Sequence, residues 1–388
     1  MKQCILHIGM PKTGTTSIQQ SLCFGLSDPA FRYLHWQRIN SNSEMAMLFG
    51  GAVENHYFSV KLGWSARQLR RYQRRVVDEL AKTLEATPAA VQLILSAEPC
   101  WRMEENGFVR LRTFMADHGY VVNIVAYIRP WKQWLESHFR QRIKGGQGLA
   151  FLPNDYAYLL DYRARIQMLE AIFGTEQVQI LNYALKDFPE GCVVRDFCQH
   201  LGIGADQVRI QRANDSLKLP AVQLLYAYHK FGPGYGRGRQ PWMEHYLVNQ
   251  QLLQLGGAPV RFHPSVVEPI LQELAPQRPW LEQRLGSAFN EDIYKADDER
   301  CIRDEADLFD FAPATLDWLA AASRSAPIRA TNRQETALAV CAQMHRLRLM
   351  GSQKVRFLRL KVRVEHTLAL FRNWIWQTKA PVMPVNGL

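Results

Sequence analysis

Long hydrophobic runs are missing from this sequence. No stretch of its 388 residues approaches the about 18 uncharged apolar residues that a membrane-spanning helix needs. The first apolar run, residues 4–8, is too short for the core of a signal peptide, and no small-residue cleavage pattern follows it. These absences argue against a transmembrane protein and against a cleaved leader.

Paired cysteine motifs are missing as well. The seven cysteines are an odd number, and none of them forms a C-x-x-C spacing. A disulfide framework and a zinc site are therefore poorly supported, and a reducing compartment fits better. We expect a cytoplasmic protein that requires no metal.

Acidic residues are scarce at one end of the chain only. Residues 331–388 hold ten Lys or Arg and two Glu, whereas residues 1–330 hold 37 basic and 34 acidic groups, a net charge of +3. This distribution does not imply nucleic-acid binding by the whole chain. We predict a main domain over 1–322, a polar linker over 323–335 and a basic, partly amphipathic extension over 336–388. The extension could pack back on the body as a helix or make peripheral contact with the inner face of an anionic membrane.

Apolar periodicity predicts an α/β fold for the main domain. Short buried-type strands alternate with helical segments, and residues 31–64 read as irregular. The expected strands are 3–8, 91–95, 121–128 and 178–182, and the expected helices are 17–22, 65–86, 130–143, 192–201 and 219–231. This order favours a mostly parallel central sheet flanked by helices. We expect Thr15, Thr16 or Ser17 to cap the first helix.

The segment from His7 to Ile18 is the most informative part of the chain. A strand leads into a loop of small residues and then into a helix, so loop N–H groups and the helix dipole converge on an anion site. Lys12 adds a positive charge, and hydroxyl groups stand at Thr13, Thr15, Thr16 and Ser17 around Gly14. The kinase and ATPase loop G-x-x-x-x-G-K-[ST] is absent, because here the lysine precedes the glycine.

Two further strand ends carry polar side chains. Pro130 keeps Arg129 extended at the tip of its strand, and Ser137 lies about two turns into the next helix, near enough to share an anion with it. Glu98 follows the strand 91–95 and should reach the same edge of the sheet. We therefore expect these groups to gather around the anion loop.

These motifs resemble the sulfotransferases that use 3′-phosphoadenosine 5′-phosphosulfate (PAPS), especially the bacterial and glycan-modifying branch. The segment Pro11–Ser17 is similar to that family's 5′-phosphosulfate loop, and residues 124–138 are similar to its 3′-phosphate element. The resemblance implies a sulfotransferase fold related to the P-loop NTPases. It also implies that Lys12 and the loop bind the phosphosulfate, while Arg129 and Ser137 bind the 3′-phosphate.

The family resemblance also suggests a catalytic base. Transfer of a sulfuryl group to an alcohol needs a group that removes the hydroxyl proton. The glycan-type and tyrosyl-protein branches use a Glu for this, and the cytosolic small-molecule branch uses a His that has no counterpart here. We predict that Glu98 is the base, that Lys12 assists in transfer, and that the acceptor is a carbohydrate or glycolipid hydroxyl.

Two other functions stay open at this point. A nucleotide-dependent, kinase-like phosphotransferase would need a Mg²⁺ system with a Lys-Ser/Thr pair at the helix start and an Asp at a strand end. A non-catalytic glycan- or membrane-binding protein would depend on the basic extension and would tolerate loss of Lys12.

Overall fold

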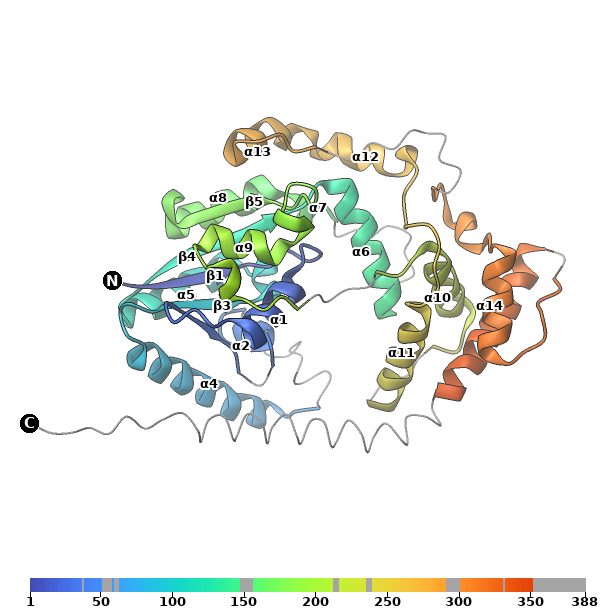
Figure 1. Cartoon of the computed structure of the whole chain (residues 1–388), viewed down its shortest axis with the longest axis horizontal. Coiled ribbons are helices and arrows are strands. Elements are labelled where there is room, and N and C mark those ends of the chain that lie inside the picture. Colours follow the sequence, from blue (N-terminus) through green and yellow to red (C-terminus); the bar gives the residue numbers. More distant parts are fainter. Residues whose placement is uncertain are drawn as a thin grey trace, which may run out of the picture. The chain divides into compact units, whose positions relative to one another are not determined.

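The structure is a computed structural model, and the chain divides into two compact units (Figure 1). It describes residues 1–36, 38–50, 58, 63–146, 156–211, 216–234, 239–290, 301–330 and 332–351. Unit 1 comprises Met1–Gln141, Ala150–Ser216 and Val260–Asp304, and unit 2 comprises Arg142–Leu149, Leu217–Pro259 and Glu305–Leu388.

Unit 1 is built on a parallel sheet, as the sequence predicts. Its described strands are β1 (Lys2–His7), β2 (Phe31–Leu34), β3 (Gln92–Ser96), β4 (Tyr120–Ile128) and β5 (Val178–Asn182). They lie in the order β2-β3-β1-β4-β5, and every neighbouring pair is parallel. The register sets His7 beside Ser96 on one side and beside Val125 on the other. All carboxyl ends therefore meet at one edge.

Helices cover both faces of this sheet (Figure 1). The α-helices of unit 1 are α1 (Thr15–Gly25), α2 (Asn42–Phe49), α4 (Ala66–Ala86), α5 (Glu105–Asp117), α7 (Tyr156–Leu160), α8 (Tyr162–Phe173), α9 (Val193–Leu201), α12 (Pro264–Leu274) and α13 (Arg278–Leu285). Short 3₁₀ turns are η1 (Glu98–Arg102), η2 (Thr175–Gln177), η3 (Pro189–Gly191), η4 (Ala205–Gln207) and η5 (Ala275–Gln277). Helix α6 (Trp131–Gly145) has residues in both units.

Strand alternation divides the core of unit 1 into two layers. Ile5, Ile94 and Val125 point to the layer that α1 and α9 cover, where Ile18 and Phe197 pack among them. Helices α5 and α8 pack together and against β4. Burial on both faces is the reason that β1 and β4 read as nearly continuous apolar runs.

The expectation of irregular structure over residues 31–64 is wrong in part, because this segment holds β2 and α2. Strand β2 has only four residues and lies at the edge of the sheet, beside β3. So short an edge strand carries too little periodic pattern to be recognised from sequence. Pairing with β3 defines it.

The described part of unit 2 contains helices joined by irregular segments, and no strand. It contains α10 (Leu219–Phe231), α11 (Arg239–Leu252), η6 (Glu305–Phe309), α14 (Pro313–Ser323) and a helix over 333–351. The last helix begins inside the segment that we expected to be a linker. One face of it is apolar and buried, through Ala337, Val340, Cys341, Met344 and Leu347. Spacings of three and four residues make this a packed amphipathic helix.

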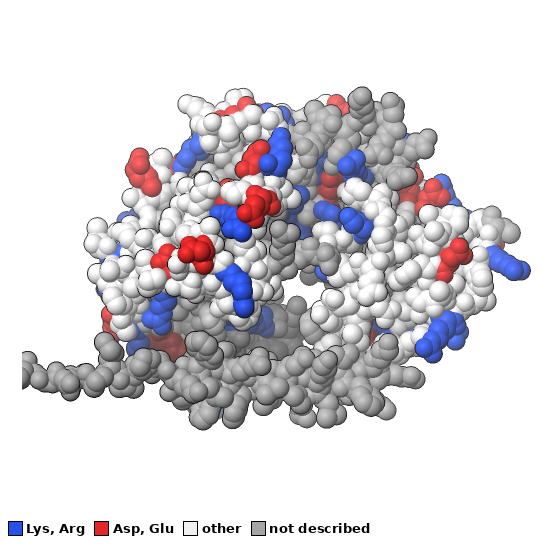
Figure 2. All heavy atoms as spheres, viewed as in Figure 1, with Lys and Arg blue, Asp and Glu red and all other residues white. Residues whose placement is uncertain are grey.

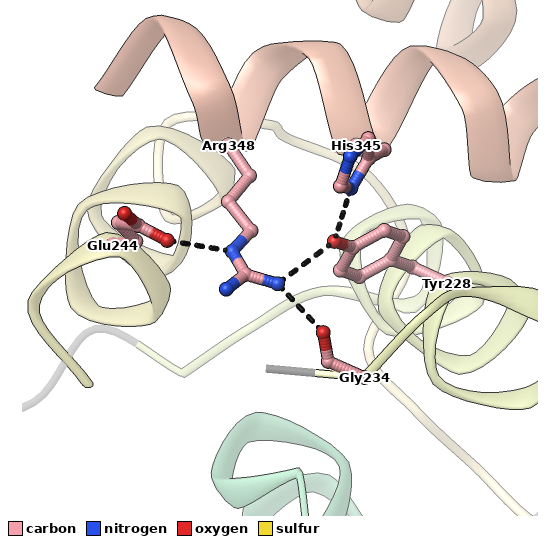
Figure 3. A network of polar contacts seen from close by, with 5 residues as sticks. All are labelled: Tyr228, Gly234, Glu244, His345 and Arg348. Atoms are coloured by element: carbon pink, nitrogen blue, oxygen red, sulfur yellow. Dashed lines mark hydrogen bonds and ion pairs between the residues drawn. The ribbon is translucent and has the colours of Figure 1, made fainter. Parts of the chain in front are cut away.

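A buried ion pair fixes the helix 333–351 within unit 2 (Figure 3). The Arg348 guanidinium donates to Glu244 on α11 at 2.9 Å, and also to the Tyr228 hydroxyl and the Gly234 carbonyl at 3.3 and 2.7 Å. His345 lies 3.0 Å from the same Tyr228 hydroxyl. The ion pair therefore has hydrogen-bond partners that offset the cost of burying its charges.

The apolar end of the predicted extension lies outside the described residues, as do residues 352–388 in general. Within the described residues, no helix is both long enough and apolar enough to cross a membrane.

Candidate active site

The carboxyl ends of three neighbouring strands carry the residues that the sequence singles out. Strand β1 leads into the loop 8–14, β3 leads into Glu98, and β4 leads into Arg129. The site lies within unit 1, where β3, β1 and β4 are adjacent. This edge is where parallel α/β sheets bind ligands.

Two residues give the loop its shape. Lys12 and Gly14 both have left-handed backbone conformations, with φ of 75° and 76°. Gly14 stands at the N-cap of α1, so the prediction that a hydroxyl side chain caps this helix is wrong. A Cβ on Gly14 would also approach Cγ1 of Val193 to 2.6 Å. A left-handed backbone conformation is strained for lysine, so contacts with the surrounding residues must stabilise it at Lys12.

One indole N–H and one guanidinium N–H donate hydrogen bonds to carbonyl groups of this loop. Nε1 of Trp134 donates to the Pro11 carbonyl at 2.9 Å, and Nη1 of Arg129 donates to the Lys12 carbonyl at 2.8 Å. The Thr13 hydroxyl, expected among the anion donors, is fully buried and donates to the Met10 carbonyl at 2.7 Å. The carbonyl groups of Met10, Pro11 and Lys12 therefore already accept hydrogen bonds from side chains of the protein.

Several backbone N–H groups of the turn have no hydrogen-bond acceptor among the described residues. Within the described residues, the backbone N–H groups of Gly14, Thr15 and Thr16 make no hydrogen bond. The Thr15 hydroxyl is buried and has no hydrogen-bond partner among those residues. Unsatisfied donors at a helix N-terminus attract an anion, because the helix dipole adds to their charge. Thr16 is exposed and Ser17 half-buried.

Arg129 also contacts two tyrosines outside the loop. Its guanidinium packs 5.1 Å from the ring centroid of Tyr183, which follows β5, and its carbonyl accepts the Tyr162 hydroxyl at 2.7 Å. Ser137 is buried on α6. The expected sharing of a phosphate between Arg129 and Ser137 stays a prediction, and the structure adds that Arg129 positions Lys12.

Glu98 is the carboxylate of this edge. It begins η1, and its N–H donates to Oδ1 of Asn42 at 2.9 Å. Burial raises the pKa of Glu98 above its ordinary value, and the positive charges of Lys12 and Arg102 lower the pKa in part. The Lys12 ammonium also lies 3.4 Å from Oε1 of Gln141. A carboxylate with a raised pKa is a stronger base than an exposed one.

A buried polar chain supports Glu98 from beneath. Nδ1 of His7 lies 2.8 Å from the Ser96 hydroxyl, and Gln19 of α1 donates to the Ser96 hydroxyl and carbonyl at 3.1 and 3.2 Å. The Gln19 amide also lies 3.5 Å from Oδ1 of Asn42. Burial lowers the pKa of His7 to about 3, so its ring is neutral at physiological pH.

Sequence analysis missed three of these supporting residues: Gln19, Asn42 and Trp134. Gln19 had a detectable signal, because it is a polar residue on the apolar side of α1, next to Ile18 and Leu22. Asn42 had none, since its role depends on α2 lying beside the end of β3.

Comparisons with known proteins give limited similarity. No family model matches the chain. An uncharacterised protein of Archaeoglobus fulgidus is 31% identical over 127 residues, which are 32% of this chain and 34% of that protein. The chain thus matches about a third of the length of this relative.

Two solved structures resemble this one. A sulfotransferase from Alicyclobacillus acidocaldarius has a TM-score of 0.43 at 14% identity, covering 74% of this chain and 97% of that one. A sulfotransferase domain from the curacin biosynthetic pathway has a TM-score of 0.32 at 15% identity, covering 55% and 79%. Both are sulfotransferases, the family that the sequence motifs resemble. Because both TM-scores are low, we argue the function from the residues of the site.

Proposed function

We propose that this chain is a sulfotransferase that transfers the sulfuryl group of PAPS to a hydroxyl of a carbohydrate or glycolipid. One observation carries the proposal: a loop with unsatisfied N–H donors, the Lys12 ammonium and the Glu98 carboxylate lie together at the carboxyl edge of the sheet. An anion site and a base side by side are what sulfuryl transfer to an alcohol requires.

The donor fits the loop by charge and by hydrogen bonding. The N–H groups of Gly14, Thr15 and Thr16 and the buried Thr15 hydroxyl are donors that lack acceptors among the described residues. A phosphosulfate supplies several acceptor oxygens and negative charge. Lys12 adds a charge-assisted contact to this group, and Arg129 and Ser137 are assigned to the 3′-phosphate.

The chemistry then needs one proton transfer by the protein. Glu98 accepts the proton of the acceptor hydroxyl as the oxygen forms a bond to sulfur. The bond between sulfur and the phosphate oxygen breaks, and adenosine 3′,5′-bisphosphate leaves with the negative charge. Lys12 and the loop N–H groups stabilise charge on the sulfuryl and leaving phosphate groups.

The first test measures binding and transfer together. We expect the protein to bind adenosine 3′,5′-bisphosphate more tightly than ATP–Mg²⁺, and to move labelled sulfate from PAPS into a glycan or glycolipid fraction of total extracts. The Glu98→Gln variant should keep the nucleotide affinity while transfer falls by about 10²-fold or more. Preference for ATP–Mg²⁺, or near-normal transfer by this variant, would contradict the proposal.

Arg129 needs a test that separates its two contacts. Because it holds the Lys12 carbonyl, Arg129→Ala should weaken binding of PAPS and of adenosine 5′-phosphosulfate alike through the loop. If it also binds the 3′-phosphate, the loss for PAPS exceeds that for adenosine 5′-phosphosulfate, which lacks this group. Equal losses would limit Arg129 to positioning the loop.

A further inference from the structure

Helix α4 carries a row of arginines that the site does not use. Arg67, Arg70, Arg71, Arg74 and Arg75 are all exposed. The apolar side chains that pack α4 into unit 1 are Leu69, Tyr72, Val76, Leu80 and Leu84. At 3.6 residues per turn the two sets lie on opposite sides of the helix, so the five guanidinium groups form one face, here called the α4 arginine face.

Contacts within the chain do not explain the α4 arginine face. Arg75 lies over the Tyr72 ring at 4.9 Å and 3.6 Å from the Glu79 carboxylate. Within the described residues, Arg67, Arg70, Arg71 and Arg74 make no hydrogen bond or ion pair. Four charges of one sign are therefore held close together without compensation from those residues.

Helix stability does not explain it either. The positive end of a helix dipole is its N-terminus, so a cation in the first turn and an acid in the last turn are unfavourable. In α4, Arg67 lies in the first turn and Glu85 in the last turn, and the dipole favours neither. The N-terminus is instead satisfied by a neutral capping box of Ser65 and Gln68.

The chemistry of the face suits a ligand that carries several oxyanions in a row. The guanidinium fork binds carboxylate, sulfate or phosphate oxygens bidentately, and residues 67–75 extend over about 12 Å of helix. Within the described residues, α4 exposes no large apolar side chain of the kind that a membrane-surface helix inserts. On the face drawn in Figure 2, basic and acidic residues are interspersed.

The α4 arginine face is connected to the candidate site through α2. The Tyr72 hydroxyl donates to the buried Glu44 of α2 at 2.7 Å, and Gln73 donates to the Met47 carbonyl at 3.4 Å. Helix α2 begins at Asn42, which holds the N–H of Glu98. Two helices in contact, α2 and α4, therefore carry both the arginines and the residue that binds the Glu98 N–H.

We infer that the α4 arginine face binds an acidic polysaccharide, a chain that bears both carboxylates and free hydroxyls, and so holds the acceptor on unit 1. The choice of a carbohydrate polymer and its acceptor role rest on the proposed function, whereas the binding of a polyanion rests on α4 alone.

Titration of the full-length protein with an oligogalacturonate of defined length, at several salt concentrations, tests the inference. Neutral dextran is the control ligand. The variant Arg71→Gln/Arg74→Gln is matched by Arg329→Gln/Arg346→Gln, which removes two exposed arginines of unit 2. We expect about 10-fold weaker binding for the α4 variant and at most 2-fold for the control. The slope of log Kd against log salt should fall by about 1.4 for the α4 variant, at about 0.7 counterion per charge.

Three results would overturn the inference: no binding of oligogalacturonate, equal losses in the two double variants, or tighter binding to phosphatidylserine vesicles or single-stranded DNA that the α4 variant loses and the control variant keeps. Adenosine 3′,5′-bisphosphate affinity is measured on the same samples, and neither variant should change it. If the polymer binds through α4 but the nucleotide does not, the inference on binding stands and the proposed function fails.

Discussion

Replacing Asn42 with alanine probes how the fold positions Glu98. Oδ1 of Asn42 accepts the Glu98 N–H at 2.9 Å, and the adjacent Gln19 amide reaches the same oxygen at 3.5 Å. The substitution removes this acceptor from the first residue of η1, where the helix itself offers no partner for the N–H. The Glu98 carboxylate itself stays in the chain.

The magnitude follows from the bond that is lost. Leaving a buried donor without its acceptor costs about 1–3 kcal/mol. If this cost falls on the positioning of Glu98, kcat decreases by about 5-fold to 150-fold, at 1.36 kcal/mol for each factor of ten. Within the described residues, Asn42 makes no hydrogen bond to the loop 8–14, so affinity for adenosine 3′,5′-bisphosphate should not change.

Asn332→Ala is the matched control. Oδ1 of Asn332 also accepts a glutamate N–H at 2.9 Å, that of Glu335, but in unit 2. Urea unfolding, calorimetric nucleotide binding and sulfate transfer should be measured on both variants. Both should lose some free energy of unfolding, and only Asn42→Ala should lose kcat. A transfer rate for Asn42→Ala equal to that of Asn332→Ala would refute the reasoning.

Three further outcomes follow from the charges and the packing. Arg102→Gln removes a positive charge that lowers the pKa of Glu98, so this pKa should rise. Because the carboxylate must be ionised to accept a proton, the acid limb of the pH profile of kcat/KM should move to higher pH. An unmoved limb would contradict Glu98 as the base. Arg348→Ala removes the guanidinium that lies 2.9 Å from the buried Glu244. The free energy of unfolding of unit 2 in urea should therefore fall by about 3–5 kcal/mol, and a loss under 1 kcal/mol would show that water replaces the guanidinium. A chain that ends at Gly351 keeps the packed helix 333–351. If residues 352–388 contact anionic membranes, only the full-length chain should sediment with phosphatidylserine vesicles. Equal sedimentation of the two chains would exclude residues 352–388 as the membrane contact.

The sequence by itself determined the parallel sheet and the place of the candidate site. Strands β1, β3 and β4 contain short apolar runs bounded by turn residues, a pattern typical of strands that are buried on both faces of a parallel sheet. The anion loop could be located because glycine, lysine and hydroxyl residues between a strand and a helix are a local pattern. Lys12, Glu98 and Arg129 were placed at one edge because parallel strands share the direction of their carboxyl ends.

Only the tertiary structure decided how those groups are used. Thr13 has the same side chain as Thr15, yet its hydroxyl donates to the Met10 carbonyl while that of Thr15 has no partner among the described residues. The sequence predicts that Arg129 binds phosphate, and the structure adds that its guanidinium donates to the Lys12 carbonyl. Asn42 lies 56 residues from Glu98 in the chain. Hydrogen bonds between distant segments depend on three-dimensional packing, which no local spacing in the sequence encodes.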